Sequence, residues 1–244
     1  MRQRALPPSR PAAYGSGMRR SASCLLLGFA GCVGTSTPPP VPLWNGVDLA
    51  GWHADVPAAD NGQVVGPSFE VRDGVLRSNG TPPGHLITDA EFADYRLTVE
   101  WRWPGEPGNC GVLVHTSTPR RLYGMFPQSV EVQLHAGNAG DFWCIGEDVA
   151  VPDMEKRRGP KANWGVDGDK ARRIVNLTDG AEKPNGEWNQ MVVECRGDEV
   201  VVHVNGQLVN HGTGCTARHG RIALQAEGAV CEFRRLELQP LPKP

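Results

Sequence analysis

The chain has 244 residues, of which 39% are hydrophobic, a share that supports a packed core and argues against global disorder. Its formal net charge is −2. Residues 1–31 hold five of the 25 basic residues and no acids, which leaves 20 basic against 27 acidic residues, a net charge of −7, in the rest of the chain. This acidic balance argues against nucleic acid or an anionic membrane surface as a partner, so neutral ligands are expected.

The N-terminus is predicted to be a secretory signal peptide over residues 1–31. Residues 18–32 read MRRSASCLLLGFAGC, with two arginines, a short apolar run and small residues before a cysteine. This layout is typical of an export signal, and its apolar run is too short for a mature membrane-spanning helix. Met18 is an alternative start, because residues 1–17 add arginines and prolines without helping the signal.

The end of the signal resembles a bacterial lipobox, FAGC, in which Cys32 would become the lipidated first residue of the mature chain. Secretion without a lipid is the alternative. Residues 32–41 continue as a proline-rich tether that cannot pack into a core. We therefore expect an exported lipoprotein, in the periplasm or at the cell surface, that touches a membrane only through its lipid anchor.

Residues 42–241 contain short runs in which apolar and polar residues alternate, as expected for strands with one buried face. The chain has 30 glycines and 21 prolines, and Asp73-Gly74 and Asn205-Gly206 are strong hairpin signals between such runs. Two packed antiparallel sheets follow, so we predict one all-β jelly-roll β-sandwich domain over 42–241. The expected strands lie within 69–78, 85–88, 95–103, 110–116, 129–135, 189–197, 199–210, 221–228 and 231–239.

Residues 137–187 do not alternate and are predicted to be one long loop, which is usually functional or disordered at this length. Phe142, Trp143 and Trp164 indicate order in parts of it, because aromatic side chains are normally buried or in contact with a ligand. The basic runs 156–158 and 170–173 are interpreted as solvated surface.

Five cysteines follow Cys32, an odd number that would leave at least one thiol unpaired. Export permits disulfides, and Cys195, Cys215 and Cys231 are candidates for pairing, with buried free thiols as the alternative. No CxxC motif or zinc-type spacing occurs, so a structural zinc site is not expected.

The run SVEVQLH (129–135) places apolar residues on one face of a strand and Glu131, Gln133 and His135 on the other. In the other predicted strands, the residues on the polar face include five more candidates for the same surface: Glu100, Arg102, Asn109, His115 and Gln225. If these strands are neighbours in a curved sheet, one concave face could hydrogen-bond sugar hydroxyls and supply a general acid and base. An ordinary solvated face is the alternative, although no lysine occurs between residues 42 and 151. Four further histidines show no partner pattern and are interpreted as structural: His85, His203, His211 and His219.

The order of seven motifs resembles the 3-keto-disaccharide hydrolase domain family, formerly a domain of unknown function. The motifs are LWNGVDLAGW (43–52), VRDGVL (71–76), HLITDAEFADYRLTVEWRW (85–103), GNCGVLVH (108–115), VEVQL (130–134), GEWNQMVVECRGDEVVVHVNGQLV (186–209) and GRIALQAEGAVCEFRRLEL (220–238). The resemblance implies a concanavalin A-like jelly roll, which agrees with the strand pattern.

The resemblance also implies cleavage of glycosides whose sugar is oxidised at C3. A ketone at C3 acidifies the proton on C2, so a base can remove it, the C1 substituent can leave by elimination, and water can add later. We assign Glu131 and His135 as acid and base, and Arg102 as the cation that stabilises the enolate. Glu100 and Glu131 could alternatively act as the paired carboxylates of an ordinary glycosidase.

The substrate-binding set completes the prediction, with hydroxyl-binding side chains and one aromatic side chain for sugar stacking. It consists of Glu100, Asn109, His115, Gln133, Trp143 and Gln225. No metal ligand is assigned, and a divalent metal on Glu131, His135 or His115 is an open alternative. Two other functions remain open, a non-catalytic carbohydrate-binding module and a structural or protein-interaction domain of the cell surface.

Overall fold

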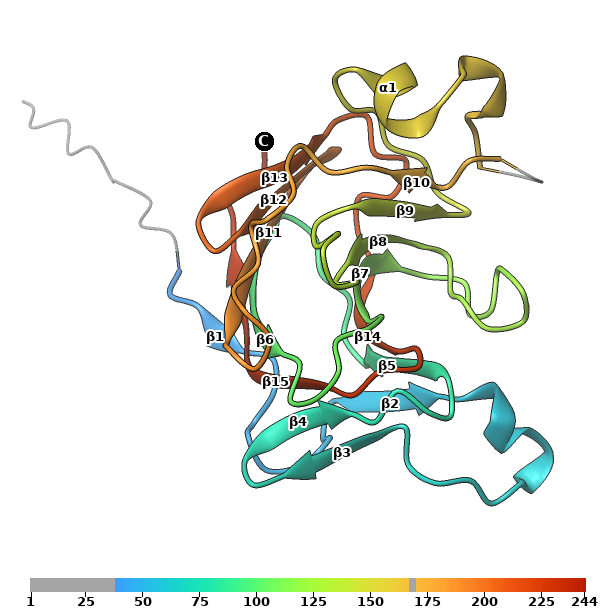
Figure 1. Ribbon diagram of the computed structural model, residues 1–244, viewed down its shortest axis with the longest axis vertical. Coiled ribbons are helices and arrows are strands. Elements are labelled where there is room, and N and C mark those ends of the chain that lie inside the picture. The colour runs from blue at the N-terminus through green and yellow to red at the C-terminus, as the bar shows by residue number, and fades with distance from the viewer. Residues whose placement is uncertain (1–37, 167–169) are drawn as a thin grey trace, which may run out of the picture. The chain divides into compact units, whose positions relative to one another are not determined.

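The computed structural model describes residues 38–166 and 170–244, which form two antiparallel sheets (Figure 1). Sheet A contains β1 (Val41–Pro42), β3 (Phe69–Arg72), β4 (Val75–Ser78), β6 (Tyr95–Arg102), β11 (Asn189–Arg196), β12 (Glu199–Val204), β13 (Gln207–Gly212) and β15 (Cys231–Pro240). Sheet B contains β2 (Trp52–Asp55), β5 (Gly84–Thr88), β7 (Gly111–Thr116), β8 (Ser129–Gln133), β9 (Phe142–Ile145), β10 (Arg173–Ile174) and β14 (Arg221–Ala226). The helical segments are short, with α1 at Met154–Arg158 and 3₁₀ turns at Pro57–Gly62 and Lys161–Asn163.

Neighbouring strands are often distant in the sequence. Sheet A has the order β13–β12–β11–β6–β15–β4–β3, with β1 beside β15, and sheet B has the order β10–β9–β8–β7–β14–β5–β2. The C-terminal strands β14 and β15 therefore lie in the middle of different sheets, where they pair with strands from the first half of the chain. The predicted all-β fold of two antiparallel sheets is confirmed.

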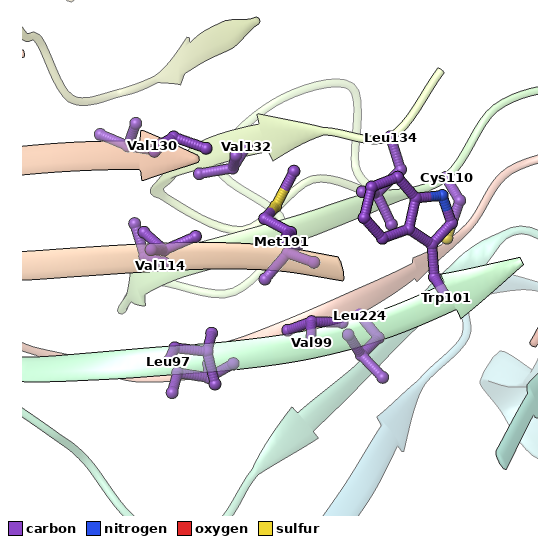
Figure 2. Close-up of a cluster of buried hydrophobic side chains, with 14 of the residues drawn as sticks. Leu97, Val99, Trp101, Cys110, Val114, Val130, Val132, Leu134, Met191 and Leu224 are labelled. Carbon is purple, nitrogen blue, oxygen red and sulfur yellow. The ribbon is translucent and has the colours of Figure 1, made fainter. Parts of the chain in front are cut away.

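The core lies between the sheets and is built from the apolar faces that the alternation predicts. Figure 2 shows side chains of β6 (Leu97, Val99, Trp101) close to side chains from sheet B (Val114, Val130, Val132, Leu224). Each of these side chains is fully buried. Because successive residues of a strand point to opposite faces, burying this face turns the polar residues of the same strands outward.

Shortening a core residue should lower the free energy of unfolding strongly. We expect Leu97→Ala to cost about 2–5 kcal/mol, because the cavity left between the sheets adds to the lost burial. Urea denaturation followed by tryptophan fluorescence would measure this. Val64→Ala is the matched control, since the Val64 side chain is fully exposed and should change stability by less than about 0.5 kcal/mol.

The segment 137–187 is not one long loop, and this corrects the sequence-based prediction. It contains β9, α1 and β10, and the two strands extend sheet B at its edge, where Ile174 pairs with Phe142. Strands of four and two residues are too short to show an alternation that the sequence pattern could detect.

The basic run 156–158 is also not solvated surface throughout. Arg157 is buried and donates from Nε to the Val175 carbonyl oxygen at 2.7 Å and from Nη2 to Asn210 Oδ1 at 2.5 Å. Arg158 is buried as well and forms an ion pair with Asp148. Both guanidinium groups therefore tie this segment to the sandwich, because buried charges are normally paired and hydrogen-bonded.

The five cysteines within the described residues are all free and buried, which agrees with the alternative of buried thiols. Burial raises the pKa of the Cys144 and Cys195 thiols to about 12, so both are neutral at physiological pH. The predicted signal peptide and Cys32 lie outside the described residues. Within the described ranges, no helix is long and apolar enough to cross a membrane.

Candidate functional site

A pocket opens on the outer face of sheet B, at the end of β8. Because Val130 and Val132 face the core, Glu131 and Gln133 of the same strand point to the outer face. The pocket has a volume of about 210 Å³. It is lined by Asn109, Gln133, His135, Asn138, Asp141, Trp143 and Arg173. We call these seven residues the sheet B pocket.

Glu131 lies beside this pocket and is only 4% exposed. It pairs in register with Leu113 of β7 and with Trp143 of β9. Its carboxyl group leans over Gly111, where a Cβ atom would come within 2.4 Å of Glu131 Oε1. The glycine therefore provides the space that this carboxyl group occupies.

The Glu131 carboxyl group is held in its neutral form. Burial, and then the nearby charge of Glu227, raise its pKa from 4.5 to about 8. Oε1 has no hydrogen-bond partner among residues 38–166 and 170–244. Glu227 accepts a hydrogen bond from Asn109 Nδ2 at 2.7 Å, and burial raises the pKa of its carboxyl group too. A protonated carboxyl group near neutral pH can act as a general acid.

Arg173 supplies the positive charge of the pocket. It donates from Nε to Asp141 Oδ2 at 2.6 Å and from Nη2 to Asn138 Oδ1 at 2.8 Å. Asp141 is 1% exposed, and its other oxygen accepts from the Asn176 backbone N–H. The Arg173 side chain keeps 42% of its surface exposed, so a buried acid holds a guanidinium group that a ligand can still reach. Arg173 lies in a basic run with no alternation, so the sequence pattern does not predict this role.

His135 lies two residues after the end of β8 and lines the pocket. Gln133 Oε1 accepts hydrogen bonds from the backbone N–H groups of Leu134 and His135, which fixes the chain at this turn. His135 Nδ1 lies 3.0 Å from the Ala136 carbonyl oxygen and 3.1 Å from Asn138 Nδ2. Asn138 Nδ2 can only donate, so its contact uses the tautomer in which Nδ1 accepts; in the other tautomer, which donates from Nδ1 to Ala136, Nε2 carries a lone pair and can accept a proton.

Arg102 and Glu100 do not belong to this site, which corrects the prediction of one shared polar face. Both residues lie on β6 in sheet A, whereas the pocket lies on sheet B. Arg102 donates from Nε to Glu232 Oε2 at 2.8 Å and lies over the Trp188 ring, and Glu100 accepts from Arg234. Alternation shows which residues of one strand share a face, but not which sheet the strand joins.

His115 is also separated from the pocket. Its backbone has a φ of +54°, and the β7–β14 register shifts at this end of the strand. The side chain is consequently buried against Tyr95, with Nδ1 at 2.9 Å from the Ala217 carbonyl oxygen. Burial lowers its pKa to about 4. The assignment of His115 to substrate binding rested on a regular strand, and the irregular backbone overturns that placement.

The remaining predicted residues do lie on the outer face of sheet B. Asn109, Gln133, Trp143 and His135 line the pocket, and Gln225 is fully buried on the neighbouring strand β14. In the part of the chain that the structure describes, no group of three or more His, Cys, Asp or Glu side chains could hold a metal ion.

The family model of the 3-keto-alpha-glucoside-1,2-lyase-like domain matches residues 39–239 of this chain. No curated protein matches it. Among solved structures, this chain is similar to a candidate glycosyl hydrolase from Parabacteroides distasonis, with 19% sequence identity and a TM-score of 0.57. The alignment covers 83% of this chain and 94% of the other.

Two further similar structures differ in what they do. One is LamA from Z. galactanivorans in complex with laminaritriose and laminaritetraose (11% identity, 84% and 99% covered, TM-score 0.51). The other is a carbohydrate-binding module from Bacillus subtilis (9% identity, 78% and 95% covered, TM-score 0.50). At these identities the likeness concerns the fold, and the predicted concanavalin A-like jelly roll is confirmed.

Proposed function

This chain belongs to the 3-keto-alpha-glucoside-1,2-lyase-like family, and from this premise we propose that it cleaves glycosides whose sugar ring is oxidised at C3. The observation that carries the proposal is a buried, protonated Glu131 beside a pocket that holds an arginine and several amides. Elimination at C1 needs an acid for the leaving oxygen and positive charge near the ketone oxygen. Both groups are present on one face of one sheet.

The first step is removal of the C2 proton. His135 Nε2 accepts this proton. The electron pair of the C2–H bond forms a C2–C3 double bond, and the π electrons of the ketone move to the C3 oxygen, which gives an enolate. Arg173 stabilises this charge, because a fixed guanidinium group in a partly desolvated pocket favours the charged state of the reaction. Arg173 thus takes the role that the sequence analysis assigned to Arg102.

The second step is departure of the C1 substituent. The enolate restores the C3 ketone and forms a C1–C2 double bond while the C1–O bond breaks. Glu131 gives its proton to the leaving oxygen and becomes a carboxylate. Water can then add across the double bond and complete a hydrolysis. Gln133 and Asn109 would hold hydroxyl groups of the sugar, and Trp143 would stack on its ring.

The second candidate is a non-catalytic carbohydrate-binding module. The small pocket, lined by amides and one tryptophan, fits sugar binding alone, and the similar structures include such a module. In either case the ligand is a neutral carbohydrate. We also propose, from the signal peptide and Cys32, that the protein is exported and lipid-anchored.

The decisive experiment is turnover of a 3-keto-glucoside with a chromogenic leaving group, with the unoxidised glucoside as the control substrate. We expect release from the keto substrate alone, because only the ketone acidifies the C2 proton. The same assay with EDTA tests the metal alternative. Binding of the keto sugar without release of the leaving group would contradict the proposed catalysis and favour a carbohydrate-binding module.

Replacing each of the two candidate arginines by glutamine in turn should show which of them stabilises the enolate. We expect Arg173→Gln to lower kcat/KM by about 10²–10³-fold, the loss that follows removal of one group that stabilises an oxyanion. Arg102→Gln is the matched control and should stay within threefold of the wild type, since Arg102 lies on the other sheet. Equal losses in both variants would contradict the assignment of Arg173.

A further inference from the structure

A row of buried polar side chains continues from Glu131 across the outer face of sheet B. In the register of β14 and β5, Gln225 pairs with His85. On the other side, Ala223 pairs with Leu113 and Leu224 with Val112, so that Gln225 lies opposite Gly111. The Glu131 carboxyl group leans over Gly111, and His85, Gln225 and this carboxyl group are therefore neighbours. We call these three side chains the inner row.

Five side-chain atoms of the inner row are buried without a hydrogen-bond partner among the described residues. His85 and Gln225 are both 0% exposed. These five atoms are both ring nitrogens of His85, the amide nitrogen and oxygen of Gln225, and Glu131 Oε1. Buried polar groups in folded proteins are almost always hydrogen-bonded, because an unpaired one is costly. Five unpaired atoms in one row therefore form a cluster of donors and acceptors that a ligand could satisfy.

His85, at one end of the inner row, lies beneath the segment 117–128, which joins β7 to β8. The Phe126 ring meets His85 edge to face, with 5.7 Å between the ring centroids. Leu122 and Phe126 pack on an apolar cluster of sheet B that contains Leu113 and Ala223, next to the inner row. Arg120 of the same segment forms ion pairs with Asp55 and Asp60. An apolar contact and ion pairs thus hold this segment over the His85 end of the row.

The inner row is electrically neutral. Burial lowers the pKa of His85 to about 4, although the charge of Asp55, its neighbour in register on β2, raises it. Glu131 is protonated at neutral pH and Gln225 has no charge. Uncharged groups with both donors and acceptors suit a neutral ligand that carries hydroxyl and carbonyl oxygens, rather than an anion or a cation.

We propose that His85 and Gln225 are substrate-binding residues that hydrogen-bond the oxidised sugar ring, and that the segment 117–128 opens to admit it. This inference rests on the proposed function and extends its site beyond the sheet B pocket. Glu131, only 4% exposed, joins this extended site to the sheet B pocket. Under this proposal His85 binds substrate, whereas the sequence pattern predicts a structural role for it.

The test compares His85→Leu and Gln225→Leu with the wild type, in both turnover of the chromogenic 3-keto-glucoside and thermal unfolding. We expect kcat/KM to fall at least 30-fold while Tm stays equal or rises, because an apolar side chain of similar size removes unpaired polar atoms. His115→Leu is the control, since His115 is also a buried neutral histidine but lies in the core, and its kcat/KM should stay within threefold. A structural role would lower Tm together with activity.

Each outcome decides the proposal. Activity within threefold in both inner-row variants, or a parallel loss of Tm and activity in both, would overturn it while the proposed function stands. If the wild type binds the keto sugar in calorimetry without turning it over, the proposed catalysis fails, and loss of binding in the two variants still supports the inner row. Absence of both binding and turnover in the wild type would overturn both proposals.

Discussion

Replacing Glu131 by Gln is expected to lower kcat/KM of the 3-keto-glucoside reaction by about 10²–10⁴-fold, the usual contribution of a general acid. Glutamine keeps the size of the side chain but cannot give a proton to the leaving oxygen. In the wild type, activity should fall as the pH rises through about 8, where Glu131 loses its proton. A full pH profile of kcat/KM measures both effects, and a wild-type profile that stays flat up to pH 9 would contradict the acid role.

The same substitution should have the opposite effect on stability. The pKa of Glu131 is raised from 4.5 to about 8 in the folded state, so the folded state binds the proton more tightly than the unfolded chain. The stability that this proton contributes is complete below pH 4.5 and is lost as the pH rises to 8. Glu131→Gln should therefore be more stable than the wild type at pH 8–9 and show a weaker pH dependence in urea denaturation. A variant that is less stable than the wild type at pH 9 would show that the folded state does not raise the pKa of the Glu131 carboxyl group.

Substitution of Gly111 by alanine is expected to lower kcat/KM by about 10²-fold, because a displacement of about 1 Å in a catalytic group is enough for such a loss. The added methyl group would lie 2.4 Å from Glu131 Oε1 and must push the carboxyl group aside. Steady-state kinetics of the variant would measure the loss. Gly66→Ala is the matched control, since a Cβ atom there meets nothing within 4 Å.

A double variant identifies the cause of the Gly111 effect. If the methyl group acts only through the Glu131 carboxyl group, adding Gly111→Ala to Glu131→Gln should cause little further loss of activity. Losses that multiply would instead mean that Gly111 acts on the pocket independently of Glu131.

Much of the fold could be predicted from short-range patterns. The alternation in β6, β8 and β11 identified the strands and their buried faces, and it placed Glu131 and Gln133 opposite Val130 and Val132 as the structure has them. These features depend only on the two-residue period of a strand, so one strand carries all the information needed. The motif order identified the family for the same reason, because it is a linear property of the chain.

The site was predicted less completely, since it combines strands that are distant in sequence. Arg102 was assigned to the Glu131 face but belongs to sheet A, and Arg173 occupies the pocket from a strand of two residues. His115 faces the core because its backbone has a positive φ, which no alternation pattern reveals. His85 appeared structural because its partner Gln225 is separated from it by 140 positions.

The order of residues along the chain is enough to predict an all-β protein of one family and the polar face of each long strand. Which polar faces meet, and which of their groups are buried, depends on how the strands assemble into two sheets. Strand pairing depends on contacts between distant segments, and the pKa of Glu131 depends on the solvent that those contacts exclude. The chemistry of the site therefore follows from how the sheets are assembled, since the same carboxyl group on an exposed strand would be ionised at neutral pH.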